Sequence, residues 1–240
     1  YNTVVGDEAG TAITTGDQNT FVGAFSGEAT ATTADNTGLG LSSLRANTGA
    51  YNTALGSQSL RTNTTADNNT AVGYKALYVN TTGTQNTAVG ANSADEVTTG
   101  SDNTALGFRS LASTTTGASN VAIGSDALRT NTTANNNTAV GYQALVLNTT
   151  GTSNVAVGAG ALDANTTASN NTAVGRDALT DNTTGGENTA VGYQALTNNT
   201  TADNNTAFGY TALRDNTTGT SNTALGVNNL RLNTTANHNT

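Results

Sequence analysis

The side chains that could do acid, base or metal chemistry are few and scattered along this sequence. The single histidine, His238, has no second histidine and no cysteine to work with, so a nucleophile–histidine pair or a histidine metal site has no partner set. The adjacent acids Asp7–Glu8 and Asp95–Glu96 would point to opposite faces of a strand and would not converge on a substrate. We therefore expect no catalysis, no cofactor and no metal, and we interpret these acids as solvated surface groups.

Arginine is the charged residue that recurs with fixed spacing. Five arginines share one position of the repeat described below: Arg45, Arg61, Arg129, Arg214 and Arg231. Glu28, Asp95 and Asp163 occupy the same position, which makes either an exposed edge of mixed sign or a stripe for an anionic glycan. With only eight basic residues and a net charge of −8, the chain lacks the basic footprint of a nucleic-acid partner.

The strongest pattern is the repeat of Asn-Thr-Ala-Val-Gly every 17 residues. Its glycine, the anchor glycine, recurs from Gly6 to Gly226 with one shorter step between Gly40 and Gly56. The full unit reads Asn-Thr-Ala-Val-Gly-Tyr-x-Ala-Leu-x-x-Asn-Thr-Thr-Gly/Ala-x-x. From Gly117 onward the Gly/Ala position alternates strictly, so the genetic unit is expected to span two repeats.

A period of 17 residues is too short for most helical repeats, which need about 33–47 residues. It fits one coil of a β-solenoid, in which short strands are joined by tight turns. Apolar residues are 35% and charged residues 10% of the chain, and proline is absent, which permits only a thin core. The sequence predicts an all-β parallel β-solenoid (β-roll) of about fourteen coils, forming one repeat array over residues 1–240, with more degenerate repeats in 1–50.

Two columns of large apolar side chains are expected to fill the coil. One is the residue before the anchor glycine and the other lies four residues after it. Representative predicted core residues are Val140, Leu145, Val157, Leu162, Val174 and Leu179. By strand alternation the anchor alanine then points outward.

The anchor asparagine and glycine are predicted to be structural. Stacked identical amides can hydrogen-bond in a ladder, and asparagine also closes turns; the glycine indicates positive φ or a close backbone approach. The predicted ladder residues are Asn69, Asn86, Asn103, Asn120, Asn137, Asn154, Asn171 and Asn188, with Gly73, Gly90, Gly107, Gly124, Gly141 and Gly158.

The Asn-Thr-Thr segment, present in nine of the units, is an N-glycosylation sequon. Candidate glycan carriers are Asn148, Asn165 and Asn182, in a secreted eukaryotic or archaeal protein. In a bacterium or phage the same segments are expected to be plain turns.

Two stretches carry a family likeness. Asn120-Val121-Ala122-Ile123-Gly124 resembles the head repeats of trimeric autotransporter adhesins, and Gly141-Tyr142-Gln143-Ala144-Leu145 with its Asn-Thr-Thr segment is similar to repeat arrays of phage tail-fibre proteins. The resemblance implies a left-handed roll, a homotrimer, and a structural rod of an extracellular fibre or adhesin on a cell or virion surface. A receptor or a glycan is the implied partner. No apolar run is long enough to insert in a membrane, and we expect the sequence to be a segment of a longer chain.

Assembly and function leave alternatives open. An outward alanine column flanked by the aromatic residues after the glycine would suit a trimer axis, whereas alanine at a tight corner would suit a monomer. Stacked threonines also permit an ice-binding surface, and the arginines a glycan-binding one. A glycan-degrading enzyme is disfavoured, because no acids cluster where the repeat is irregular.

Overall fold

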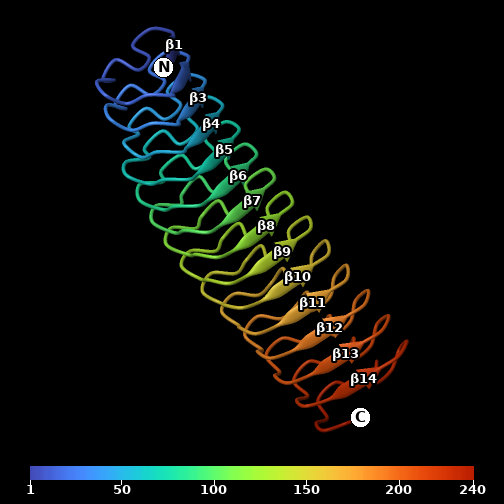
Figure 1. Ribbon diagram of the computed structural model, residues 1–240. Coiled ribbons are helices and arrows are strands. Elements are labelled where there is room, and N and C mark those ends of the chain that lie inside the picture. The colour runs from blue at the N-terminus through green and yellow to red at the C-terminus, as the bar shows by residue number, and fades with distance from the viewer. The chain divides into compact units, whose positions relative to one another are not determined.

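The computed structural model describes all residues from Tyr1 to Thr240 and contains fourteen short parallel strands and no helix. The chain therefore also has no helix with the length and apolarity that crossing a membrane requires. It forms two compact units, Tyr1–Ser119 and Asn120–Thr240, and in each unit successive coils lay their strands side by side (Figure 1). The predicted all-β parallel solenoid is confirmed, and the handedness stays a prediction.

Each coil contributes one three-residue strand. The first unit holds β1 (Thr3–Val5), β2 (Thr20–Val22), β3 (Thr37–Leu39), β4 (Thr53–Leu55), β5 (Thr70–Val72), β6 (Thr87–Val89) and β7 (Thr104–Leu106). The second holds β8 (Val121–Ile123), β9 (Thr138–Val140), β10 (Val155–Val157), β11 (Thr172–Val174), β12 (Thr189–Val191), β13 (Thr206–Phe208) and β14 (Thr223–Leu225).

In most strand pairs, residues at the same position of the repeat lie opposite one another. Between β11 and β12, for example, Thr172 lies opposite Thr189, Ala173 opposite Ala190 and Val174 opposite Val191. The fixed period makes this register unambiguous, because a slip by one residue would reverse every side chain between the inside and the outside.

The leucine column, four residues after the anchor glycine, fills the coil as predicted. Leu145, Leu162 and Leu179 have no exposed surface. The valine column was predicted wrongly: Val140, Val157 and Val174 are only partly buried. The anchor alanines between the columns, such as Ala139 and Ala156, are the fully buried residues instead.

The inversion follows from the asparagine. By the two-residue period, the anchor asparagine and alanine share one face of the extended segment, and the threonine and valine share the other. Asn154 is fully buried, because its amide satisfies backbone groups inside the coil. Ala156 lies on the same face as Asn154 and therefore also points inward. Its methyl group is small enough to be buried together with the Asn154 amide and Leu162. The prediction that the larger valine side chains point inward and the alanines outward is therefore wrong.

The irregular second coil shows how the interior is kept full. Gly10 and Gly27 stand where most other coils carry the leucine, and Phe21 stands at the alanine position with no exposed surface. A Cβ on Gly27 would come within 2.5 Å of the Phe21 ring, and one on Gly38 would lie 3.1 Å from it. One phenylalanine thus replaces the missing leucines, and glycines make room for it.

Tight turns explain two further columns. Leu145 has a φ of 55°, a left-handed conformation that disfavours branched side chains; its full burial offsets that cost. Gly158 has a φ of 137°, and a Cβ there would lie 2.6 Å from the carbonyl carbon of Gly175. The prediction that the anchor glycine marks positive φ and close backbone approach is confirmed.

The Gly/Ala position alternates between two turn geometries in the second unit. At the glycine members, such as Gly151 and Gly185, a Cβ would strike the carbonyl oxygen of Ala168 or Ala202 in the next coil. In the Gly185 coil both threonine amides donate to the Thr200 carbonyl, whereas the Ala168 coil makes only the first of these bonds. Throughout the chain no two consecutive coils both carry a side chain larger than hydrogen at this position.

Candidate functional site

The anchor asparagines form a buried hydrogen-bond ladder. The amide oxygen of Asn154 accepts from the backbone N–H of Asn171 at 3.0 Å, and the Asn171 side-chain amide donates to the Gly185 carbonyl at 2.9 Å. The eight asparagines predicted for this ladder are each at most 1% exposed. This confirms the predicted stacking and assigns these residues to the architecture, not to a ligand.

The sequon asparagines form a second ladder, which contradicts their prediction as glycan carriers. Asn148, Asn165 and Asn182 have no exposed surface. The Asn165 amide donates to Asn148 Oδ1 at 2.9 Å and to the Ala168 carbonyl at 3.1 Å, and its own Oδ1 accepts from Asn182. Since a glycan would need the same buried nitrogen, glycosylation is incompatible with the folded coil.

The second ladder is interrupted in the first unit. Val97 occupies the asparagine position with no exposed surface, and the same coil carries Ala94 in place of the leucine. The valine fills the volume that the alanine leaves, but it offers no amide. As a result the buried Oδ1 of Asn80, in the preceding coil, has no hydrogen-bond partner.

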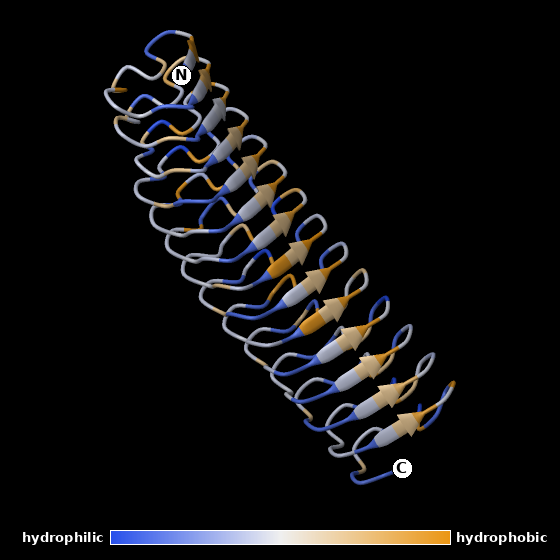
Figure 2. Cartoon of the chain, viewed as in Figure 1, coloured by the Kyte–Doolittle hydropathy of each residue, from blue (hydrophilic) through white to orange (hydrophobic).

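The outer face of the strands carries no charge. Its threonine column comprises Thr3, Thr20, Thr37, Thr53, Thr70, Thr87, Thr104, Val121, Thr138, Val155, Thr172, Thr189, Thr206 and Thr223. Its valine column comprises Val5, Val22, Leu39, Leu55, Val72, Val89, Leu106, Ile123, Val140, Val157, Val174, Val191, Phe208 and Leu225. We call these two columns the Thr–Val face; in Figure 2 most of its strands pass from pale at the threonine to orange, and β8 and β10 are orange from their first residue.

Aromatic residues extend the apolar surface beyond the anchor glycine. The side chains of Tyr74, Phe108, Tyr142 and Tyr210 are each about half exposed. Tyr193 stacks on Tyr210 with ring centroids 5.3 Å apart. We call the valine column together with these aromatic positions the apolar strip.

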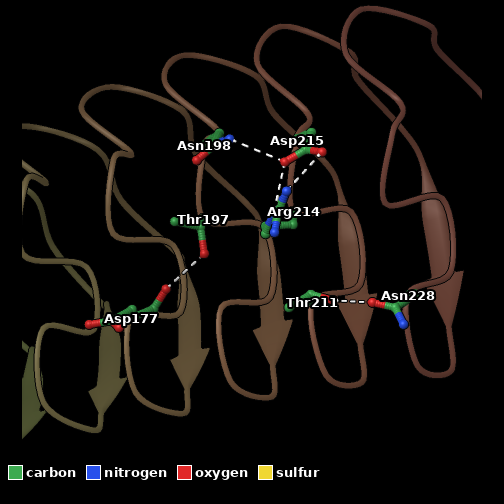
Figure 3. Close-up of polar contacts among 7 residues, drawn as sticks. All are labelled: Asp177, Thr197, Asn198, Thr211, Arg214, Asp215 and Asn228. Carbon is green, nitrogen blue, oxygen red and sulfur yellow. Dashed lines mark hydrogen bonds and ion pairs between the residues drawn. The ribbon is translucent and has the colours of Figure 1, made fainter.

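Three arginines of the arginine column form ion pairs, and the choice between a mixed-sign edge and a glycan stripe stays a prediction. Arg45 pairs with Glu28 at 2.6 Å, Arg129 with Asp126 at 3.7 Å, and Arg214 with Asp215 at 2.7 Å. Figure 3 shows the last pair, whose carboxylate also accepts from the Asn198 amide.

Neighbouring coils are also joined by polar contacts other than the two asparagine ladders. The Thr197 hydroxyl donates to the Asp177 carbonyl at 3.1 Å, and the Thr211 hydroxyl bonds to Asn228 Oδ1 in the next coil (Figure 3). Like the asparagine ladders, these contacts bond each coil to the one beside it.

Asp95 and Asp163, two acids of the arginine column, are half buried. This differs from the expectation that the acids are solvated surface groups. Burial raises the pKa of Asp95 to about 6, with a smaller contribution from the Glu96 carboxylate. Burial also raises the pKa of Asp163, and the nearby Asp181 and Asp177 add to the shift. No group of three or more His, Cys, Asp or Glu residues is arranged to hold a metal ion.

A groove of about 660 Å³ lies on the surface of the first unit. It is lined by Thr11, Ala12, Glu28, Ala29, Arg45, Ala46, Arg61 and Thr62. The sequence carried a signal for it that the repeat analysis missed: three successive coils have alanine two residues after the leucine position. Most later coils carry larger residues there, such as Val79 and Leu147.

Comparison with known proteins adds no family to this geometry. No protein-family model matches the sequence, and no curated protein matches it.

Proposed function

We propose that this chain is a structural rod of an extracellular fibre or adhesin, such as a phage tail fibre or a cell-surface adhesin head, that mediates attachment or assembly. The observation that carries the proposal is the contrast between the inside and the outside of the coil. Inside, two asparagine ladders bond each coil to the next. Outside, the same columns of uncharged side chains repeat along each unit, which is a property of a scaffold that presents a surface.

The apolar strip favours self-association of this rod. Side chains such as Leu106, Phe108, Tyr142 and Phe208 each expose about half of their surface. Soluble monomers seldom leave a contiguous apolar patch of this kind in water. The homotrimer expected from the resemblance is therefore proposed to pack through the apolar strip; the alanine column is unavailable, because it is buried within the coil.

Sedimentation of charge variants tests this packing. Val157→Glu combined with Val174→Glu places two charges on the apolar strip, and we expect it to convert a trimer into folded monomers. The matched control, Thr167→Glu with Thr184→Glu, alters two exposed threonines of the Asn-Thr-Thr segments and should leave the trimer intact. A wild-type protein that sediments as a folded monomer would contradict the proposal.

Ice binding is the second candidate, and the Thr–Val face favours it. Threonine and valine are both β-branched and therefore stiff, and they stand in register on strands about 4.8 Å apart. No charged residue interrupts the 28 positions of the two columns. A rigid lattice of hydroxyl and methyl groups is suited to organising water into an ice-like layer.

Thermal hysteresis separates the two candidates. If the face binds ice, a folded monomer should depress the freezing point, and Thr189→Tyr should abolish the effect by breaking the flat surface. Thr201→Tyr, on an exposed turn, should retain it. Absence of hysteresis together with a trimeric mass supports the fibre.

A further inference from the structure

The groove in the first unit runs across four successive coils. Its lining residues belong to two adjacent positions of the repeat, the arginine column and the position after it. With coils about 4.8 Å apart, the groove is about 14 Å long. It follows the direction in which the coils stack, so an extended chain could lie along it.

The sequence explains why the surface is hollow here. Ala12, Ala29 and Ala46 line the groove in three successive coils, whereas most later coils carry a larger side chain at this position, such as Val79 and Leu147. Ala29 is an exposed member of this lining. The depression thus lies in the part of the first unit where the repeat is least regular, since Gly10 and Gly27 also replace the leucine in its first two coils.

Two guanidinium groups stand on neighbouring coils along this groove. Arg45 uses Nε to bind Glu28 at 2.6 Å, which leaves both of its terminal NH₂ groups without an acceptor. Arg61 donates to the Tyr78 hydroxyl and forms no ion pair, unlike Arg176 and Arg214, which pair with Asp177 and Asp215. In a chain of net charge −8, these unused donors create a local preference for anions.

Aromatic rings hold these cations in place. The Arg45 guanidinium lies 5.0 Å from the Phe25 ring centroid and that of Arg61 lies 5.5 Å from the Tyr78 ring. The ammonium of Lys75, the only lysine, lies 5.3 Å from the Tyr78 ring. Cation–π contacts restrict the side chains, and a guanidinium fork held in this way matches a carboxylate bidentately.

We propose that this groove binds a carboxylate-bearing polysaccharide, a polyuronate, with successive uronate groups on Arg45 and Arg61 and the sugar rings over its alanines. The proposal rests on the attachment function proposed above and names the chemistry of the surface to which the rod would attach.

Calorimetric titration with a short oligogalacturonate tests it, with the neutral galacto-oligosaccharide of the same length and a sulfated one as comparison ligands. We expect binding of the uronate, weaker binding of the sulfated sugar and none of the neutral one. Arg61→Gln should lower the affinity on the order of ten-fold through loss of a charged hydrogen-bond donor. Ala29→Leu, which narrows the groove without changing charge, should lower it as well.

The control is Arg214→Gln, which removes an arginine from the same column in the second unit and should leave the affinity unchanged. Circular dichroism of each variant checks the fold. Equal binding of the neutral sugar, stronger binding of the sulfated sugar, or unchanged affinity in Ala29→Leu would each overturn the proposal. The fibre proposal is judged separately by sedimentation, because none of these variants alters the apolar strip.

Discussion

Phe21 occupies the space above Gly27 in which most other coils place a leucine. The ring has no exposed surface, and a Cβ on Gly27 would come within 2.5 Å of it. In the regular coils a small alanine and a large leucine occupy these two positions, as Ala54 and Leu60 do. Here the large residue, Phe21, stands at the alanine position and the small one, Gly27, at the leucine position. The interior is thus filled by volume and not by a fixed residue at each position.

This exchange predicts a rescue. Phe21→Ala should cost about 3–5 kcal/mol of unfolding free energy by opening a cavity, and Gly27→Leu alone should destabilise by overpacking. The double variant restores the Ala–Leu pair and should recover much of the loss. Urea unfolding of the four proteins gives the coupling energy, and strictly additive losses would show that the two residues do not share one space.

The second asparagine ladder predicts a large effect from a small truncation. Asn165→Ala leaves Asn148 Oδ1 without its side-chain donor and removes an acceptor from Asn182. Unsatisfied buried groups cost about 1–3 kcal/mol each, so a loss of about 3 kcal/mol is expected. Thr167→Ala, two residues along on the exposed turn, should change stability by less than about 0.5 kcal/mol. Equal losses in the two variants would show that the ladder contributes nothing.

Adjacent glycines at positions 185 and 186 offer a steric test. A Cβ on Gly185 would strike the Ala202 carbonyl and lie 2.7 Å from Asn182 Oδ1, whereas one on Gly186 would have its nearest neighbour at 3.2 Å. We expect Gly185→Ala to destabilise by about 1–3 kcal/mol and Gly186→Ala to be much milder. Thermal unfolding compares them directly, and the reverse order would rule out the proposed clash.

Asp95 predicts how stability depends on pH. Because burial raises its pKa to about 6, the folded protein binds the proton more tightly than the unfolded chain. The resulting stabilisation is fully present below about pH 4 and is lost as the pH rises through about 6. Asp95→Asn should therefore raise stability at pH 7 and flatten the profile between pH 4 and 7, measured by urea unfolding. An unchanged profile would mean that this carboxyl is solvated.

Much of the fold could be predicted because the period is rigid. The leucine column, the anchor glycine and the first asparagine ladder each follow from identical residues standing above one another. The inward face could not be chosen from size, because alternation allows either Ala139 or Val140 to point inside. The deciding fact is that Asn137 shares the alanine's face and is buried, which a composition-based estimate of the core does not weigh.

The second ladder and the groove escaped prediction for different reasons. Asn165 stands in a motif that also suits an exposed turn, and only the closed coil shows that its amide points inward. The alanines at positions 12, 29 and 46 are visible in the sequence, but alanine marks a groove only when its side of the coil is known. Both cases needed the path of the backbone.

The alternating glycine and alanine have a consequence for how such an array can change its length in evolution. Recombination between identical repeats could insert or delete any multiple of 17 residues. Removing one coil at Gly185 would bring Ala168 next to Ala202, and duplicating a single alanine coil would create the same conflict. Exchange of two coils at a time preserves the alternation. In the second unit, the steric rule therefore lets the array lose an alanine coil, duplicate a glycine coil or exchange two coils together, whereas losing a glycine coil or duplicating an alanine coil carries a penalty.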